Sequence, residues 1–373
     1  GGFRSGGKGY YALDITDPNA SAENIVRWEF TDDNDADVGF SYGAAQIVRL
    51  NSGSWVAIVA NGYNSSNEKA VLYVLDISDG SIIKKIIVDA AGQNGLSSPI
   101  AVSIDNDFTI DVVYAGDLKG NIWRFDLTST NSSDWTFSKL FATEGARPIT
   151  GALTVGNHPA NRTGRVVYFG TGEYLQASDL NDSATEYFYA IADNDECFSS
   201  SACINSSELL SQTIDSAENN GRTISNNSID WQQHKGWRLP LSAIDGIAER
   251  VVGRPLLIGS QLVFNSIVPS SDRCNSGGET FTYSLNRNNG GLVKAPTIDY
   301  NADGVVNQDD RLEGNLIVAG RLDSVSDINN DPIPELIILS SADGEKRCIN
   351  VAGRCIMIEN PDRAGRVSWL QIK

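Results

Sequence analysis

Residues 111 to 128 read Asp-Val-Val-Tyr-Ala-Gly-Asp-Leu-Lys-Gly-Asn-Ile-Trp-Arg-Phe-Asp-Leu-Thr. An apolar run ends in small residues at Gly116, a polar turn with a second glycine follows, and mixed apolar and polar residues resume at Asn121. Two such runs around a glycine-containing turn predict a β-hairpin. The stretch therefore predicts antiparallel β-structure rather than a helical framework.

This hairpin pattern recurs along the chain. Its second strand is expected at Tyr10 to Thr16, Leu72 to Ser78, Asn121 to Thr128, Tyr187 to Ile191 and Phe281 to Leu285. From the second copy on, its first strand is expected at Trp55 to Gly62, Asp111 to Gly116, Arg165 to Gly172 and Leu262 to Ser266. Outer strands are expected near Ala44, Pro99, Pro148 and Pro255, and at Ile83 to Val88, Trp135 to Phe141 and Trp237 to Leu241. Repeated four-strand units predict an all-β fold, a β-propeller of six or seven blades, one of them irregular, with loop insertions.

We expect residues 1–373 to form a single propeller domain. The strands at residues 10 to 30 need completion by the C-terminal end or by upstream chain. Residues 195–235 are rich in Ser, Asn and Asp and predict a polar surface insertion, with a short helix around Ser206 to Gln212 as one option. No signal-peptide pattern opens the chain, so we expect a C-terminal fragment of a larger secreted protein.

Composition limits the classes of function. The chain holds 29 basic and 47 acidic residues, a net charge of −18. A surface for nucleic acid or anionic membrane is therefore not expected. The sequence has no run of about 18 apolar residues, so no membrane span is expected.

Residues 299 to 310 read Asp-Tyr-Asn-Ala-Asp-Gly-Val-Val-Asn-Gln-Asp-Asp. Oxygen-bearing side chains stand at loop positions 1, 3, 5, 9 and 12, with glycine at position 6 for the sharp turn. Calcium takes six to eight oxygen ligands, which this spacing can gather around one ion. The sequence predicts a calcium site whose ligands are Asp299, Asn301, Asp303, the Val305 carbonyl, Asn307 and Asp310.

Two nine-residue segments have a shorter form of this spacing, and a solvated polar turn is the alternative for both. A candidate second site comprises Asp327, Asn329, Asp331, Ile333 and Glu335, before the apolar run Leu336 to Leu339. A candidate third site comprises Ser103, Asp105, Asp107, Thr109 and Asp111. Several calcium sites in one chain indicate an extracytoplasmic protein.

Five cysteines fall as two close pairs and one single residue. Cys197 with Cys203, and Cys348 with Cys355, are expected to form local disulfides in an oxidising compartment, with buried free thiols as the alternative. Cys274 is expected to be unpaired or bonded to chain outside this sequence. The two histidines, His158 and His234, stand in no recognisable catalytic setting and are expected in surface loops.

Several segments in order along nearly the whole chain resemble the C-terminal domain of the PilC/PilY family of type IV pilus biogenesis factors and tip adhesins. They are Gly7-Lys-Gly-Tyr-Tyr-Ala-Leu-Asp-Ile-Thr-Asp-Pro18, Trp55-Val-Ala-Ile-Val-Ala-Asn-Gly-Tyr-Asn64, Tyr114-Ala-Gly-Asp-Leu-Lys-Gly-Asn-Ile-Trp-Arg-Phe-Asp126, Arg147-Pro-Ile-Thr150, Tyr168-Phe-Gly-Thr-Gly-Glu-Tyr174, Glu249-Arg-Val-Val252 and Gly365-Arg-Val-Ser-Trp369.

The resemblance implies a modified β-propeller, no enzymatic activity, and a calcium loop that regulates pilus extension and retraction. It implies twitching motility and adhesion as outputs, minor pilins of the pilus tip as partners together with the upstream domain and a host-cell surface, and a periplasmic or cell-surface location. Asn307 stands where the family often has aspartate, and Asp310 could compensate for this departure.

The hairpin pattern is also compatible with two other classes of function. One is a general extracellular binding propeller. The other is a calcium-dependent quinoprotein dehydrogenase, whose blades these hairpins also resemble, but those enzymes place two adjacent cysteines beside the quinone and no adjacent pair occurs here. Trp123 is interpreted as blade packing rather than as a cofactor platform, and Gly170-Thr-Gly172 as a turn at a strand end.

Overall fold

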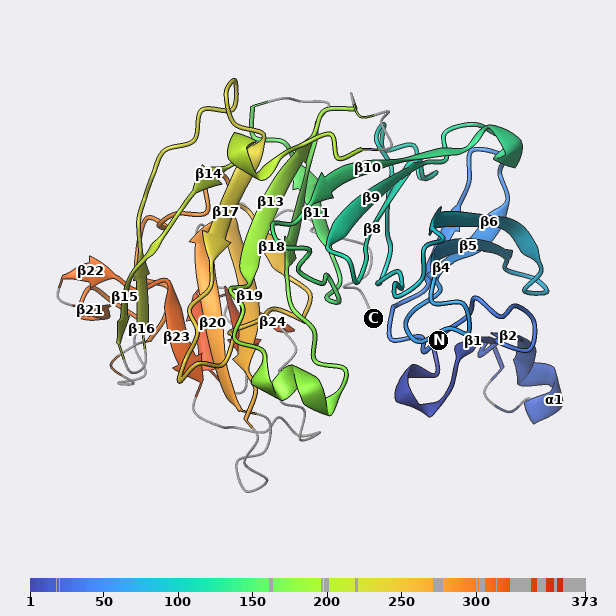
Figure 1. Cartoon of the computed structure of the whole chain (residues 1–373), viewed down its shortest axis with the longest axis horizontal. Helices are drawn as coiled ribbons and strands as arrows, with labels where there is room; N and C mark the ends of the chain where they lie inside the picture. The colour runs from blue at the N-terminus through green and yellow to red at the C-terminus, as the bar shows by residue number, and fades with distance from the viewer. Residues whose placement is uncertain are drawn as a thin grey trace. The chain divides into compact units, whose positions relative to one another are not determined.

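The structure, a computed structural model, describes the chain apart from residues 18, 20, 161–163, 196, 198–200, 219, 220, 271–277, 300, 302–305, 313, 323–336, 341–346, 352, 353 and 358–373. It consists of β-strands joined by turns and short helical segments (Figure 1). Backbone contacts divide the chain into two compact units, Gly1–Val155 with Asp193–Ser206, and Gly156–Ala192 with Ser207–Lys373. Each unit has a hydrophobic core of its own.

The first unit contains two four-stranded antiparallel meanders, which are the blade units that the repeating hairpin predicts. In each sheet the strands pair in the order in which they follow along the chain. The first meander comprises β3 (Gln46–Arg49), β4 (Trp55–Ala60), β5 (Ala70–Asp76) and β6 (Ile82–Asp89), and the second comprises β7 (Ile100–Val102), β8 (Val112–Gly116), β9 (Asn121–Asp126) and β10 (Thr136–Ala142).

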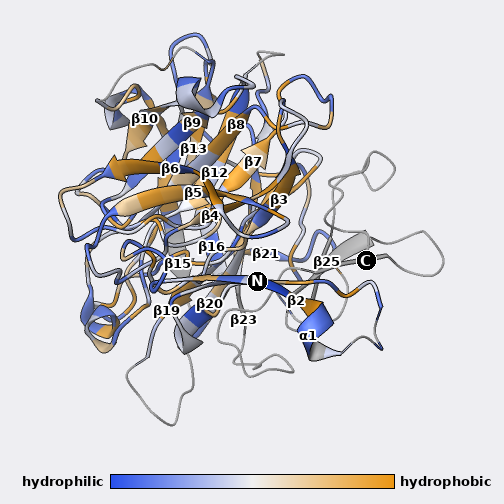
Figure 2. Cartoon of the chain, turned by 90° about the vertical axis from the view of Figure 1, so that its right-hand side faces the viewer, coloured by the Kyte–Doolittle hydropathy of each residue, from blue (hydrophilic) through white to orange (hydrophobic). Residues whose placement is uncertain are grey.

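The middle strands β4 and β5 of the first meander are mostly apolar, as their colours in Figure 2 show. β8 is buried along its whole length, and β4 after its first residue, because neighbouring layers cover both of their faces. The β8–β9 turn is tight. Gly120 has φ +75°, and a Cβ there would lie 2.0 Å from the Thr143 Oγ1 atom, so only glycine fits. The turn thereby sets the register of the hairpin.

A two-stranded sheet of β1 (Gly9–Leu13) and β2 (Val26–Thr31) precedes the first meander. Tyr10, Trp28 and Phe30 pack with Tyr73 of β5 in one core cluster. Phe30 meets Tyr73 edge-on, with ring centroids 5.0 Å apart. The two strands thus continue the core of the β3–β6 meander.

The second unit is built mainly on two larger sheets. The five-stranded sheet runs β11 (Thr154–Asn157), β12 (Arg165–Gly170), β13 (Tyr187–Asp193), β17 (Gly236–Pro240) and β14 (Leu210–Ser211). The six-stranded sheet runs β15 (Ile214–Glu218), β16 (Gly221–Ile224), β23 (Ala319–Leu322), β20 (Glu279–Asn286), β19 (Gln261–Val268) and β18 (Leu256–Ile258). Phe188 of β13 stacks on Phe264 of β19 and so joins the two sheets, with ring centroids 4.0 Å apart. Phe264 also stacks on Tyr283 of β20 in its own sheet, with centroids 4.7 Å apart.

The described part of the chain also contains shorter elements. They are the helical turns η1 (Arg4–Gly6), α1 (Ala22–Ile25), η2 (Ser132–Asp134), η3 (Ala177–Asn181) and η4 (Ser206–Glu208), the hairpin of β21 (Arg311–Leu312) and β22 (Asn315–Leu316), and the sheet of β24 (Ile337–Ser340), β25 (Arg347–Val351) and β26 (Arg354–Met357).

Residues 195–235 contain more structure than their polar composition indicates. The expected helical turn is the single turn η4, after which β14 pairs in parallel with β17. β16 is buried throughout, and its Gly221 and Arg222 pair with Gly320 and Ala319 of β23. The segment therefore adds strands to both large sheets of the second unit.

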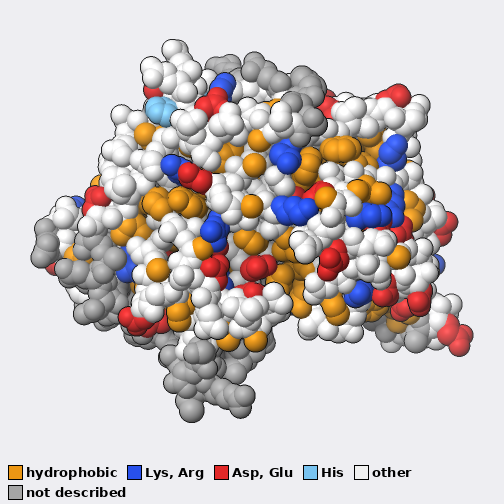
Figure 3. Space-filling view, in the orientation of Figure 1, with side chains coloured by type: hydrophobic (Ala, Val, Ile, Leu, Met, Phe, Trp, Pro, Cys, Tyr) orange, Lys and Arg blue, Asp and Glu red, His pale blue; other side chains and the backbone are white. Residues whose placement is uncertain are grey.

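The surface carries charges of both signs. Acidic, basic and hydrophobic side chains are interspersed on the face shown in Figure 3. None of the helices among the described residues is long and apolar enough to cross a membrane.

Candidate metal centre

The predicted calcium loop lies in the second unit, between β20 and β21. Thr297, just before the loop, is buried, and its hydroxyl donates to the Ser284 Oγ atom of β20 at 2.9 Å. This bond fixes the loop's entry to a core strand. At the exit, the Arg311 guanidinium donates to the Gln308 Oε1 atom at 2.7 Å and to the Gly314 carbonyl at 3.0 Å. Both ends of the loop are therefore anchored.

The carboxylate of Asp310 closes the loop from within. It is 1% exposed. Its Oδ2 atom accepts the Asn307 N–H at 2.7 Å, and its Oδ1 atom accepts the Asn301 N–H at 3.3 Å. Positions 3, 9 and 12 of the loop are thereby drawn together. A buried carboxylate that organises backbone N–H groups costs less desolvation energy than an isolated one.

The described donors of this loop fit a hard cation. Asp299, Asn301, Asn307 and Asp310 supply carboxylate and amide oxygens, which are the ligands that Ca²⁺ takes. The Asn307 Oδ1 atom accepts the Asp309 N–H at 2.6 Å, so this amide also shapes the turn. Asp303 and Val305 lie outside the described residues. The ligand set stays a prediction.

The structure describes one of the other two candidate sites and not the other. Asp327, Asn329, Asp331, Ile333 and Glu335 all lie outside the described residues. The candidate third site is the loop between β7 and β8, which the structure describes in full.

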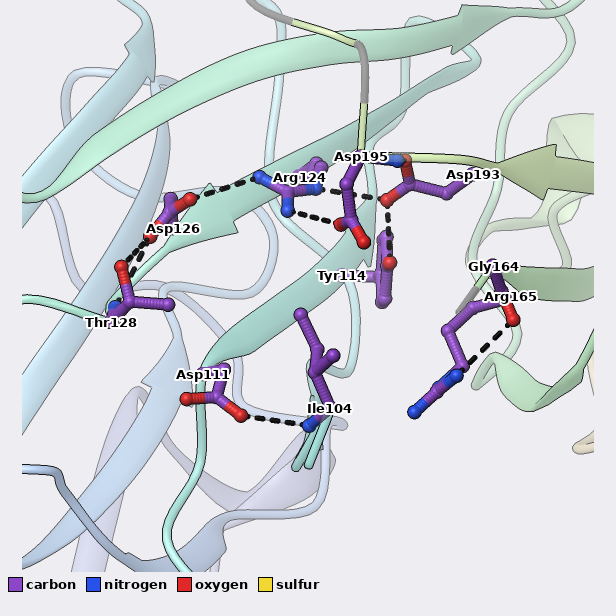
Figure 4. A network of polar contacts seen from close by, with 10 residues as sticks. All are labelled: Ile104, Asp111, Tyr114, Arg124, Asp126, Thr128, Gly164, Arg165, Asp193 and Asp195. Atoms are coloured by element: carbon purple, nitrogen blue, oxygen red, sulfur yellow. Dashed lines mark hydrogen bonds and ion pairs between the residues drawn. The ribbon is translucent and has the colours of Figure 1, made fainter. Parts of the chain in front are cut away.

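In that loop each carboxylate has hydrogen-bond partners. The Asp111 Oδ2 atom accepts the Ile104 N–H at 2.7 Å, as Figure 4 shows, and its Oδ1 atom accepts from the Asn51 side chain at 3.0 Å. Hydrogen bonds from the Thr109 hydroxyl and N–H lower the pKa of Asp107. The Asp105 Oδ1 atom accepts the Asp107 N–H at 3.1 Å. The loop is thus ordered by its own side chains.

Among the residues that the structure describes, no three His, Cys, Asp or Glu side chains gather closely enough to hold a metal ion. For the third site this means that Asp105, Asp107 and Asp111 do not form one cluster in this conformation. Metal binding there stays a prediction.

Sequence reasoning missed a buried charge network centred on Arg124 (Figure 4). The Arg124 Nε atom donates to the Asp193 Oδ2 atom at 2.9 Å, and its Nη2 atom donates to the Asp195 Oδ1 atom at 2.7 Å. The Tyr114 hydroxyl donates to the same Asp193 oxygen at 2.6 Å. Burial lowers the pKa of Arg124, but the Asp193 charge and the Asp195 bond outweigh it and raise that pKa. The available signal was an arginine between the two large aromatic residues Trp123 and Phe125 of an expected blade strand.

A second buried cluster lies in the second unit. The Glu249 Oε1 atom accepts the Ser266 hydroxyl at 2.5 Å and the Tyr283 hydroxyl at 2.7 Å. The Arg222 Nη2 atom lies 3.7 Å from the Glu249 Oε2 atom. Burial raises the pKa of Glu249 even though Arg222 and the two hydroxyls oppose this. The cluster ties β16 to the core through a charge pair.

The cysteine predictions have three outcomes. Cys197 and Cys203 form a disulfide, as expected. Cys348 and Cys355 lie on the paired strands β25 and β26, where Cys348 is opposite Met357 and Cys355 is opposite Asn350. The second disulfide therefore stays a prediction. Cys274 lies outside the described residues.

The surface position expected for His158 is wrong. Its side chain packs edge-on against Trp231, with ring centroids 4.5 Å apart, and the residue is buried. Burial lowers the pKa of His158, so the ring favours its neutral form. Trp231 is far from His158 in the sequence, so the polar residues around His158 gave no sign that its side chain would be covered. His234 sits in a turn where its Nδ1 atom lies 3.1 Å from the Asp230 carbonyl.

Comparison with known proteins places this architecture in a family. The model of the PilY1 beta-propeller domain matches residues 1–227, more than half of the chain. A type IV pilus biogenesis factor PilY1 homolog of Xylella fastidiosa (strain Temecula1) is 33% identical, covering 79% of this chain and 22% of the relative. The type IV pilus biogenesis factor PilY1 of Pseudomonas aeruginosa (strain UCBPP-PA14) is 28% identical, covering 99% of this chain and 36% of the relative.

The crystal structure of the Pseudomonas aeruginosa PilY1 C-terminal domain superimposes with a TM-score of 0.81 at 27% identity, covering 97% of this chain and 79% of that one. The chain spans only about a fifth to a third of the length of these curated relatives. The modified β-propeller with four-stranded antiparallel blades is confirmed, and the number of blades stays a prediction. The chain belongs to the PilY1 β-propeller family, whose curated relatives are type IV pilus biogenesis factors.

Proposed function

We propose that this chain is a non-enzymatic, calcium-binding domain that regulates the extension and retraction of type IV pili, supporting twitching motility and adhesion. The observation that carries the proposal is the buried Asp310 carboxylate, which draws together three positions of a calcium-type loop in a chain of the PilY1 family. Its partners are minor pilins of the pilus tip, the upstream part of the longer protein and a host-cell surface, and it acts in the periplasm and at the cell surface.

Six groups would hold the ion: the side chains of Asp299, Asn301, Asp303, Asn307 and Asp310 and the Val305 carbonyl. Bound calcium supplies two positive charges that offset the repulsion among the acidic side chains of the loop. The chain's own contribution is positioning. The Asp310 carboxylate accepts backbone N–H groups at loop positions 3 and 9, and Arg311 and Thr297 anchor the exit and entry of the loop.

Regulation requires calcium to discriminate between two states of the domain. An ion that binds equally to a partner-competent and a partner-incompetent conformation shifts no equilibrium between them. We propose that the loaded loop presents an ordered surface to the pilus partner, with a coupling on the order of 1 to 3 kcal/mol.

The test is made in cells. A strain producing the Asp299→Ala/Asp303→Ala double variant should change in surface pilus number or twitching motility at normal protein abundance. The matched control is Asp309→Ala, which removes a carboxylate from an exposed, non-ligand position of the same loop. Wild-type piliation and motility in the double variant would disprove the regulatory role, and an ion bound at the loop would then have a structural role only.

An enzymatic role is tested separately. The quinoprotein reading needs a cofactor platform, but Trp123 is 5% exposed, packs in the core, and donates its indole N–H to the Asp117 Oδ2 atom at 2.8 Å. Purified protein soaked with a quinone cofactor should therefore show no bound-quinone absorbance.

A further inference from the structure

Cys203 and Ile204, which follow β13 in the chain, lie along the outer edge of β10. β10 is the last strand of its sheet, so the four-stranded meander itself leaves this edge without a partner. The N–H groups of Cys203 and Ile204 donate to the carbonyls of Lys139 and Leu140, both at 3.1 Å. Phe141 and Ile204 form a parallel bridge, and Ile204 is 6% exposed. A strand edge that could pair with another chain is thereby covered.

Two anchors hold the chain before Cys203 and Ile204 next to β9 and β10. One is ionic: Arg124 of β9 binds Asp193 and Asp195, as Figure 4 shows. The other is covalent, because Cys197 and Cys203 form a disulfide whose Cα atoms are 5.8 Å apart. The Cys197 Sγ atom also lies 3.5 Å from the Lys139 carbonyl of β10. The disulfide therefore fixes Cys203 next to the strand that Cys203 and Ile204 pair with.

The contact on β10 is too short to persist without help. Two consecutive residues contribute two backbone hydrogen bonds and one buried side chain, whereas ordering each residue of a polar segment costs conformational entropy. Pairing of so few residues is not stable in isolation. A covalent link that limits the freedom of the released segment shifts this balance toward the paired state.

We propose that the Cys197–Cys203 disulfide is a redox-sensitive clasp that keeps Cys203 and Ile204 on the edge of β10. Reduction releases these two residues and uncovers the strand edge, while the Arg124 anchor and the blade beneath stay folded. The clasp is closed in the oxidising compartments where disulfides form.

The surroundings let a thiol reach the bond. Cys203 is partly exposed, whereas Cys197 is 5% exposed and lines a pocket of about 130 Å³ with Arg124, Asp126, Thr136, Phe137 and Ser138. A dithiothreitol thiolate attacks the Cys203 Sγ atom, the S–S bond breaks, and its electron pair passes to the Cys197 sulfur, which takes a proton. The second dithiothreitol thiol then forms the cyclic disulfide and releases the Cys203 thiol, so two electrons and two protons pass to the protein.

Amide hydrogen exchange tests the clasp on the folded protein with and without dithiothreitol. Exchange at the amides of residues 203 and 204 should accelerate by about tenfold or more on reduction of the wild-type protein, and equally, without a reductant, in the Cys197→Ser/Cys203→Ser variant. The amides of β8 should stay protected. If that variant does not fold, reduction of the folded wild-type protein gives the same readout.

The matched control is Cys348→Ser/Cys355→Ser, which should keep slow exchange at Ile204 until dithiothreitol is added. Unchanged exchange at Cys203 and Ile204 after complete reduction, with both thiols alkylated, overturns the proposal. Simultaneous loss of protection in β8 overturns it as well, because the bond would then hold the whole blade rather than one edge.

Discussion

The Asp310 Oδ2 atom accepts the Asn307 N–H at 2.7 Å, joining position 12 of the predicted calcium loop to position 9. A glutamate at position 12 would reach farther, so the shorter aspartate suits a loop whose backbone is already drawn inward. Asp310 orders the loop in this structure and is predicted to bind the ion as well, and a substitution can test the second role.

Asp310→Asn should weaken calcium binding by about tenfold or more, because one carboxylate oxygen that accepts a backbone N–H is replaced by an NH₂ donor. Titration calorimetry measures the change. Asp309→Asn is the control, since it removes the same charge from an exposed side chain and leaves intact the backbone N–H that Asn307 accepts. Equal affinities for the two variants would contradict the role given to Asp310.

Calcium removal should affect the protein locally. The hydrophobic core of the second unit is formed by strands outside residues 299–310, so chelation should leave the β-sheet circular dichroism unchanged while amide exchange in the loop accelerates. Loss of the β-sheet signal on chelation would show that the ion supports the whole fold instead.

Arg124→Met should lower the free energy of unfolding by about 3 to 5 kcal/mol, because it leaves the Asp193 carboxylate buried with the Tyr114 hydroxyl but without its cation. Chemical denaturation measures this loss. Arg27→Met is the matched control: its partner Asp14 lies at the surface, and water replaces that ion pair with little change in stability. If both variants lowered the free energy of unfolding by a similar small amount, burial of the Arg124 ion pairs would not make them more important for stability than a surface ion pair.

The pH dependence of stability should report Glu249. Burial raises the pKa of Glu249 in the folded protein above its unfolded value. The contribution of protonated Glu249 to the free energy of unfolding is therefore fully present below the unfolded pKa and is lost as the pH rises through the folded pKa. Relative to Glu249→Gln, the wild-type urea midpoint should therefore fall as the pH rises above about 4.3. Glu29→Gln, at an exposed position of β2, should run parallel to wild type. If the urea midpoints of wild type and Glu249→Gln changed with pH in parallel, the raised pKa of Glu249 would be refuted.

Cys348 and Cys355 should be recovered as one cross-linked peptide when periplasmically produced protein is digested without reduction. Their strands are paired, but the two residues stand two positions out of register, so the bond requires a local adjustment of the backbone. Recovery of both as free thiols would reject this bridge and leave Cys197–Cys203 as the confirmed disulfide.

The strands were predictable from sequence because their signals are local. An apolar run, a turn at Gly120 and a second run of mixed residues define the β8–β9 hairpin within a few residues, and the structure places β8 and β9 where this pattern predicts them. The spacing of the 299–310 loop is local too, so it was visible in the sequence, and the structure adds that Asp310 at position 12 is buried and accepts the Asn307 N–H.

What the sequence alone left open are contacts between distant residues. Arg124 meets Asp193 across 69 positions, Trp231 covers His158, and β16 enters the six-stranded sheet only because β23 supplies its partner edge. No periodic pattern or fixed spacing in the sequence signals these contacts, because each depends on which distant segments the fold brings together. The sequence by itself determined the repeating blades and the calcium-type loop, and the tertiary structure decided which polar residues are buried and which segment covers the edge of β10.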